Sequence, residues 1–180
     1  MVNEKLYEEI IVFDEKRAAT IIGNKGETKA KIEKITHTVI EINKGIAKIS
    51  GKDILNIETA VNILSAISIG FTPNNAIKLK ELDVFLTQIS FKHKNKNRQK
   101  VIAGRIIGKQ GKIRKKIEVL CDVALLINTS KAYIIGSAKN TGLAKNTIEQ
   151  IINGSKHRAV INWLQEVSSN KEPYLETVIV

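Results

Sequence analysis

The stretches Ile21-Ile22-Gly23-Asn24-Lys25-Gly26 and Ile106-Ile107-Gly108-Lys109-Gln110-Gly111 lie 85 residues apart and share the pattern Ile-Ile-Gly-X-X-Gly. The similarity continues without a gap, and residues 21–51 and 106–136 are identical at 12 of 31 positions. Roughly two identities are expected by chance, so a match of this extent marks an internal repeat. The chain therefore contains two copies of one domain.

The residues around each copy of the pattern predict the same order of elements. An apolar stretch, Tyr7 to Phe13 or Val84 to Phe91, predicts a strand that leads into a short helical segment ending at Ile-Ile-Gly. A helix with apolar residues at i, i+4 and i+7 follows the second glycine. Two short strands and a last helix come next, with the strands predicted at 39–42, 46–49, 123–127 and 132–135. The order βααββα predicts an α+β fold in which each domain is a three-stranded antiparallel sheet packed on helices.

A further short helix is predicted after each copy, opened by Thr72-Pro73 in the first and by Ser155 in the second. The predicted division is a first domain at 1–70, a helical linker at 71–82, a second domain with a C-terminal helix at 83–169, and a tail at 170–180. The role of the tail is left open.

The net charge of +11 is unevenly distributed along the chain. Residues 1–70 contain ten Lys or Arg and ten Asp or Glu, so the whole excess lies in the remaining part. Between Lys92 and Lys116 there are eleven basic residues and no acidic one. Such a block is usually a solvated face or a flexible arm, but this block contains a glycine loop suited to phosphate contact. The charge therefore favours a nucleic-acid-binding surface.

Each copy resembles the KH domain of type I, whose signature is Ile-Gly-X-X-Gly between two helices. The resemblance implies two tandem KH domains, each with a groove for about four nucleotides of single-stranded RNA beside the loop. It implies an aliphatic floor under the bases, for which Ile22, Ile107, Ile40 and Leu125 are the candidates. The glycines let the backbone approach a phosphate, and the following helix directs its N-terminal N–H groups at the same phosphate.

The candidate RNA-binding residues lie in and beside the two loops. The second loop continues into a basic helix, whereas Glu27 follows the first loop, so the second domain is expected to contribute most of the affinity. The candidates are Ile22, Gly23, Asn24, Lys25, Gly26 and Lys29 in the first copy, and Arg105, Ile107, Gly108, Lys109, Gln110, Gly111, Lys112, Arg114 and Lys115 in the second.

No pattern in the sequence indicates catalysis, a metal site or a cofactor. The histidines His37, His93 and His157 lie in separate elements, and Cys121 is the only cysteine. The glycine loops lack the Gly-Lys-Ser/Thr ending of a triphosphate-binding loop. We therefore expect no enzyme activity, and the absence of a signal peptide or a long apolar run predicts a cytoplasmic protein without a membrane span.

The repeat and the segment Ile151 to Val160 resemble the archaeal twin-KH proteins related to eukaryotic small-ribosomal-subunit assembly factors, which hold the 3′ end of the rRNA precursor. The resemblance covers roughly residues 5–168 and includes an intact first loop. It implies binding of small-subunit rRNA, with the 3′-end endonuclease and translation initiation factor two as possible partners. Two alternatives stay open: an RNA adaptor for an exosome-like nuclease, and a single-stranded-DNA-binding or transcription-regulating protein.

Overall fold

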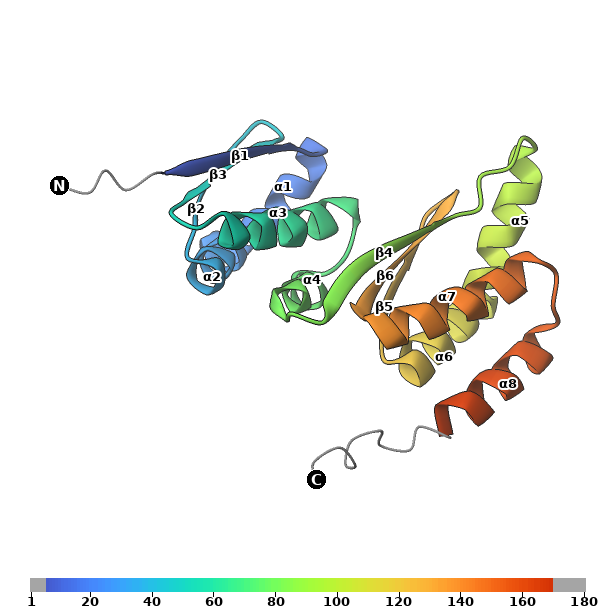
Figure 1. Cartoon of the computed structure of the whole chain (residues 1–180). Helices are drawn as coiled ribbons and strands as arrows, with labels where there is room; N and C mark the ends of the chain where they lie inside the picture. The colour runs from blue at the N-terminus through green and yellow to red at the C-terminus, as the bar shows by residue number, and fades with distance from the viewer. Residues whose placement is uncertain (1–5, 170–180) are drawn as a thin grey trace, which may run out of the picture. The chain divides into compact units, whose positions relative to one another are not determined.

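The computed structural model describes residues 6–169, which form two compact units with a boundary between Leu86 and Thr87. The first unit begins with a strand, continues through two helices and a hairpin, and ends in two more helices (Figure 1). Its elements are β1 (Tyr7–Val12), α1 (Ala18–Ile22), α2 (Glu27–Thr36), β2 (Val39–Asn43), β3 (Ile46–Gly51), α3 (Ile54–Ile69) and α4 (Pro73–Ile77).

The second unit repeats this order, and the unit boundary falls within its first strand. Its elements are β4 (Val84–Ser90), α5 (Lys96–Ile107), α6 (Lys112–Cys121), β5 (Ala124–Ile127), β6 (Lys131–Ser137), α7 (Ala138–Ile152) and α8 (His157–Ser169).

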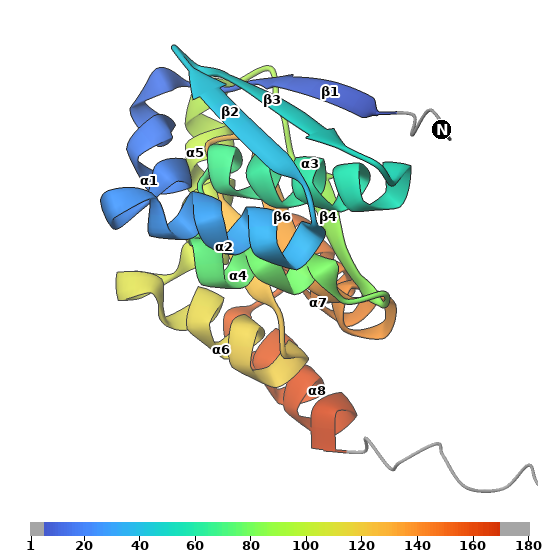
Figure 2. The same ribbon diagram turned by 90° about the vertical axis from the view of Figure 1, so that its left-hand side faces the viewer.

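Each unit contains a three-stranded sheet in which the last strand of the unit lies in the middle. The strand orders are β1-β3-β2 and β4-β6-β5. β3 pairs antiparallel with both β1 and β2, and β5 pairs antiparallel with β6. Helices α2 and α3 of the first unit lie on one side of its sheet (Figure 2). The predicted α+β fold with antiparallel sheets is therefore confirmed, and so are the strands predicted after each glycine loop.

The hairpin between β2 and β3 turns through Lys44 and Gly45, which both have positive φ angles of 43° and 80°. Two left-handed residues in a two-residue connection form the turn that matches the twist of antiparallel strands. A side chain at Gly45 would meet the carbonyl oxygen of Phe13 at 2.8 Å, and the N–H of Phe13 donates to the carbonyl of Gly45. Glycine is thus required here by conformation and by close contact with the end of β1.

The apolar helix faces and the inner faces of the sheets form the cores. In the first unit Ile32 of α2, Ile49 of β3 and Ile57 of α3 are fully buried. In the second unit Ile117 of α6 and Ile148 of α7 occupy the corresponding cluster. Cys121 is buried in that cluster.

The helix before the second loop is longer than the short segment predicted from the repeat. α1 has 5 residues and α5 has 12. The reason is the cap at Asn95, whose side chain accepts hydrogen bonds from the N–H groups of Asn97 and Arg98 and so starts the helix early. Much of the basic block between 92 and 116 is therefore helical.

The segment predicted as a helical linker forms α4, which begins with Thr72 as N-cap and Pro73 in its first turn, and a 3-10 turn, Lys78–Lys80. Both pack on α3. The tail at 170–180 lies outside the described residues. Among residues 6–169, no helix has both the length and the apolar character that crossing a membrane requires.

Candidate nucleic-acid interface

The two glycine loops have almost the same backbone conformation. Gly23 and Gly108 end the preceding helix with φ/ψ of 75°/177° and 72°/174°. The third residue of each loop is left-handed, with φ/ψ of 51°/26° at Lys25 and 53°/29° at Gln110. The last glycine is left-handed as well, and the next helix starts directly after it. Two sequences that differ at both middle positions therefore build one loop geometry.

The first glycine of each loop is required by packing inside the protein. A Cβ at Gly23 would collide with the side chain of Thr28, and a Cβ at Gly108 would collide with the side chain of Ile113. From the sequence alone, glycine is expected here because a side chain would keep the backbone away from a phosphate. The structure shows that the neighbouring helix already excludes a side chain, because it packs against the glycine.

The second glycine of each loop has open space around it. A Cβ at Gly26 or Gly111 would meet no heavy atom within 4 Å. Each of these glycines is also the N-cap of the helix that follows, and a glycine has no side chain with which to accept from the first-turn N–H groups. This side of the loop therefore offers an anion both a close approach to the backbone and the positive end of a helix.

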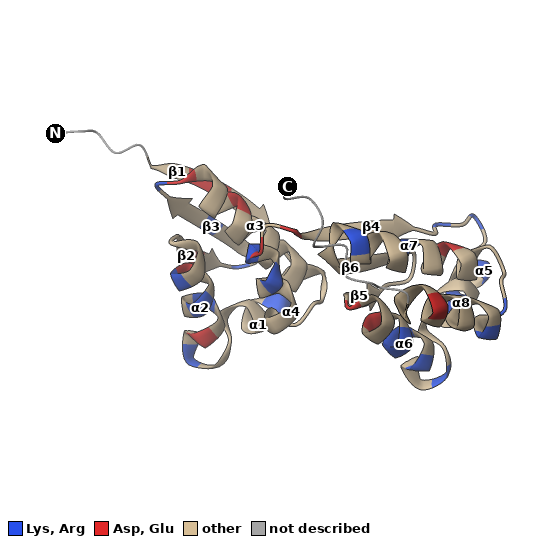
Figure 3. Ribbon diagram, turned by 60° about the horizontal axis from the view of Figure 1, so that its bottom comes forward, with Lys and Arg blue, Asp and Glu red and all other residues tan. Residues whose placement is uncertain are grey.

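The side chains in the middle of both loops are exposed. Asn24 and Lys25 lie in the first loop, and Lys109 and Gln110 lie in the second. The second loop is followed by further exposed cations at Lys112 and Lys115 on α6. Figure 3 shows basic residues along α5 and α6 and also on α2, but α2 begins with the acidic Glu27. The second interface is therefore the more cationic of the two.

Two predicted RNA contacts, Lys29 and Arg114, occupy equivalent positions and form equivalent ion pairs. Nζ of Lys29 lies 3.3 Å from Oε1 of Glu33, and the guanidinium of Arg114 lies 3.1 Å from Oε1 of Glu118. The same carboxylate oxygens accept from the backbone of the edge strand, at 2.8 Å from the nitrogen of Ile40 and at 3.0 Å from the nitrogen of Leu125.

Sequence reasoning missed these two glutamates. The signal was present, because Glu33 and Glu118 are one of the identities in the repeat at the offset of 85 residues. Each connects the helix after the loop to the edge strand of its sheet, so we include both in the candidate interface.

The predicted aliphatic floor is partly wrong. Ile22 is 36% exposed and Ile107 is half-buried beside the second loop, so both remain available to a ligand. Ile40 and Leu125 are 0% and 1% exposed, so their side chains cannot contact bases. They point to the helical side of the sheet and form core, because every second residue of a strand faces the same side.

Arg105 is held by the segment before α8. Its Nη2 donates to the carbonyl of Ser155 at 2.7 Å, and its own carbonyl oxygen lies 2.9 Å from Nε2 of His157. The side chain is half-buried, so its guanidinium connects the end of α5 to the start of α8 rather than projecting freely from the loop.

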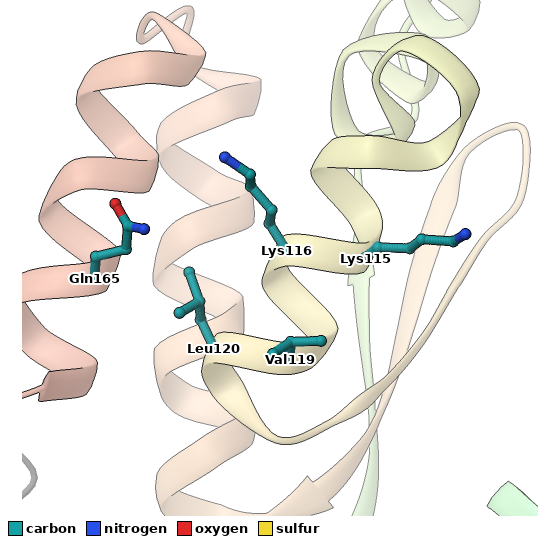
Figure 4. Close-up of a pocket in the computed structure, with 5 residues that line it drawn as sticks. All are labelled: Lys115, Lys116, Val119, Leu120 and Gln165. Atoms are coloured by element: carbon teal, nitrogen blue, oxygen red, sulfur yellow. The ribbon is translucent and has the colours of Figure 1, made fainter.

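A shallow, mainly apolar cavity lies between α6 and α8 of the second unit, lined by Lys115, Lys116, Val119, Leu120 and Gln165 (Figure 4). Lys116 extends on the side of α8, and Lys115 extends away from it. Val119 is 79% exposed. Lys115 is itself exposed, so it remains accessible to a ligand outside the cavity.

No group of three His, Cys, Asp or Glu side chains that could hold a metal ion occurs within residues 6–169. Asp14 and Asp53 serve as helix caps, each accepting a backbone N–H two residues further on. The interface is thus composed of backbone N–H groups, cations and two carboxylates.

Comparison with known proteins identifies the second unit. The family model for the second KH domain of PNO1, a eukaryotic-type KH domain of type I, matches residues 84–169. The pre-rRNA-processing protein PNO1 of Chaetomium thermophilum is 31% identical over 120 residues, which is 63% of this chain and 46% of that protein. The chain thus matches about half the length of this eukaryotic relative.

Archaeal proteins match along most of the chain. The KH domain-containing protein MJ0443 of Methanocaldococcus jannaschii is 31% identical over 164 residues, covering 87% of this chain and 72% of that protein. The crystal structure of an a/eIF2alpha-aDim2p-rRNA complex from Pyrococcus horikoshii contains a chain that is 31% identical, with a TM-score of 0.79 and coverage of 91% and 95%. The chain therefore belongs to the family of archaeal KH-domain proteins related to the eukaryotic PNO1 (Dim2) ribosome assembly factors.

Proposed function

We propose that this chain consists of two tandem type I KH domains that bind single-stranded RNA through the loops Gly23–Gly26 and Gly108–Gly111. The observation that carries the proposal is the shared loop geometry, in which an open glycine precedes an uncapped helix N-terminus. The first unit has the same element order, strand order and loop conformation as the second. The match to MJ0443 over 87% of the chain further supports this domain assignment.

The second groove contributes most of the affinity in this proposal. Lys109, Lys112 and Lys115 surround it, whereas the helix after the first loop begins with Glu27. Of the predicted contacts, the loop residues and these lysines stay accessible, while Lys29, Arg105 and Arg114 already have intramolecular partners.

The RNA is proposed to be the 3′ end of small-subunit rRNA during ribosome assembly. The related protein of Pyrococcus horikoshii was crystallised with rRNA and a/eIF2alpha, and the relative from Chaetomium thermophilum is named as a pre-rRNA-processing protein. By the same relation, initiation factor two and the 3′-end endonuclease are the proposed protein partners. The role is that of a cytoplasmic binding protein without enzyme activity.

Two measurements test the proposal. A single strand should compete for binding at physiological salt far better than a duplex of equal length, because a KH groove contacts unpaired bases. Equal competition would mean that the basic surface only coats phosphates. RNA recovered with the protein from cells should be enriched in small-subunit rRNA 3′ ends. Enrichment of unrelated transcripts would favour the exosome adaptor instead.

A further inference from the structure

The second carboxylate oxygen of Glu33 and of Glu118 has no assigned role in RNA binding. Every hydrogen bond and ion pair of these side chains uses Oε1, which accepts from the edge-strand N–H and from the cation one turn earlier. Within residues 6–169, Oε2 of neither glutamate has a partner.

The two Oε2 atoms are held in place and are reachable. The glutamate side chains are 24% and 22% exposed. Among the described residues that are buried or half-buried, every polar side-chain atom without a hydrogen-bond partner is in contact with solvent, and this includes both Oε2 atoms. Two partner residues at Oε1 fix each carboxylate, so little side-chain freedom remains to be lost when Oε2 accepts a hydrogen bond.

These atoms lie between the helix that follows each loop and the edge strand of the same sheet, where the RNA-binding proposal places the bases. Glu118 follows Arg114 by four residues on the same face of α6, in the first helix after the loop. Its bond to the N–H of Leu125 places it at the unpaired edge of β5, because that N–H points away from β6. Glu33 has the same relation to β2.

From this geometry we infer that Glu33 and Glu118 are specificity-determining residues that accept a hydrogen bond from the exocyclic amino group of a bound base. The inference rests on the proposed RNA-binding function. A carboxylate is an acceptor only, so it pairs with the N4 amino group of cytosine and is repelled by the O4 carbonyl of uracil. The neighbouring Lys29 and Arg114 balance the negative charge, which lets a polyanion approach.

The test compares cytidine and uridine strands of about eight nucleotides, which exceed one groove of about four. The two bases have the same size but differ at the exocyclic group and at N3, which carries a hydrogen only in uracil. The affinity ratio is therefore read together with the variant below, which changes only the glutamates. The wild-type chain should prefer the cytidine strand by roughly 5- to 150-fold, the range of one good base contact.

The variant E33Q/E118Q should abolish or invert this preference. The N–H of Leu125 and the guanidinium of Arg114 both require an acceptor at the Oε1 position, so the glutamine amide must place its NH₂ group where Oε2 was. An NH₂ group donates to uracil O4 and repels the cytosine amino group. The uridine strand should therefore bind as well as before or more tightly, while the cytidine strand loses affinity.

The matched control is E149Q, which changes another glutamate in an i, i+4 pair, Lys145 with Glu149 on α7. It should leave the ratio unchanged, and urea unfolding should show that all variants are folded. Equal loss of both strands in E33Q/E118Q would mean that the glutamates only support the fold, and equal gain would mean that they only repel phosphates. A wild-type ratio of one also overturns the inference while leaving the RNA-binding proposal intact, whereas failure to bind any single strand overturns both.

Discussion

The contribution of each loop to RNA affinity can be measured with a matched pair of variants. N24D/K25D and K109D/Q110D each remove one lysine and introduce two carboxylates in a solvent-exposed loop. The charge change is the same in both, so any difference in RNA affinity reports how much each groove contributes.

Both variants should fold. Lys25 and Gln110 have φ angles of 51° and 53°, and Asp is among the few non-glycine residues that tolerate this region. The new carboxylates also lie just before the N-termini of α2 and α6, where negative charge is favourable. Circular dichroism and urea unfolding check this before any binding is measured.

The expected loss follows from Coulomb's law. A pair of unit charges about 5 Å apart in water interacts with about 0.8 kcal/mol, so changing three charges near one phosphate costs about 2.5 kcal/mol. This corresponds to roughly 70-fold in the dissociation constant for K109D/Q110D. The loss for N24D/K25D should be smaller, because the neutral first unit contributes less to binding.

The salt dependence of RNA affinity compares the two loops in an independent way. The slope of log K against log salt is about −0.7 per neutralised phosphate on a single strand. K109D/Q110D should flatten this slope by at least that amount, and N24D/K25D should flatten it less. Fluorescence anisotropy with a labelled single strand at several salt concentrations measures both quantities. Equal losses of affinity and of slope in the two variants would refute the dominant role of the second groove.

Two further predictions concern stability. G108A should lower the urea midpoint much more than G111A, because only the Cβ at Gly108 would collide with Ile113, whereas Gly111 has open space; similar midpoints would contradict the packing argument. R105A should destabilise the protein by about 1.5–3 kcal/mol, the usual range for a hydrogen bond to a charged group, because the carbonyl of Ser155 loses its donor. An unchanged unfolding free energy would show that this contact does not stabilise the start of α8.

The sequence alone was sufficient for the order of elements and for the position of both loops. Strand alternation and helical spacing are local properties, so the repeated pattern predicted β2, β3, α2 and their counterparts in the second copy. The loops could also be predicted from the sequence, because glycine is the residue that adopts positive φ at little cost. Gly23 and Gly26 both have positive φ. The concentration of basic residues in the second copy needed only counting.

Only the tertiary structure decided which side chains remain available to a ligand. Arg105 looks like a free loop cation until the chain brings Ser155, 50 residues away, within hydrogen-bonding distance. Leu125 lies in the apolar run Ala124–Ile127, and such a run does not reveal which residues face the core. The bond from Leu125 to Glu118 likewise depends on the packing of α6 against β5. Contacts between elements depend on how faces meet in space, and a one-dimensional pattern of residue types does not contain that information.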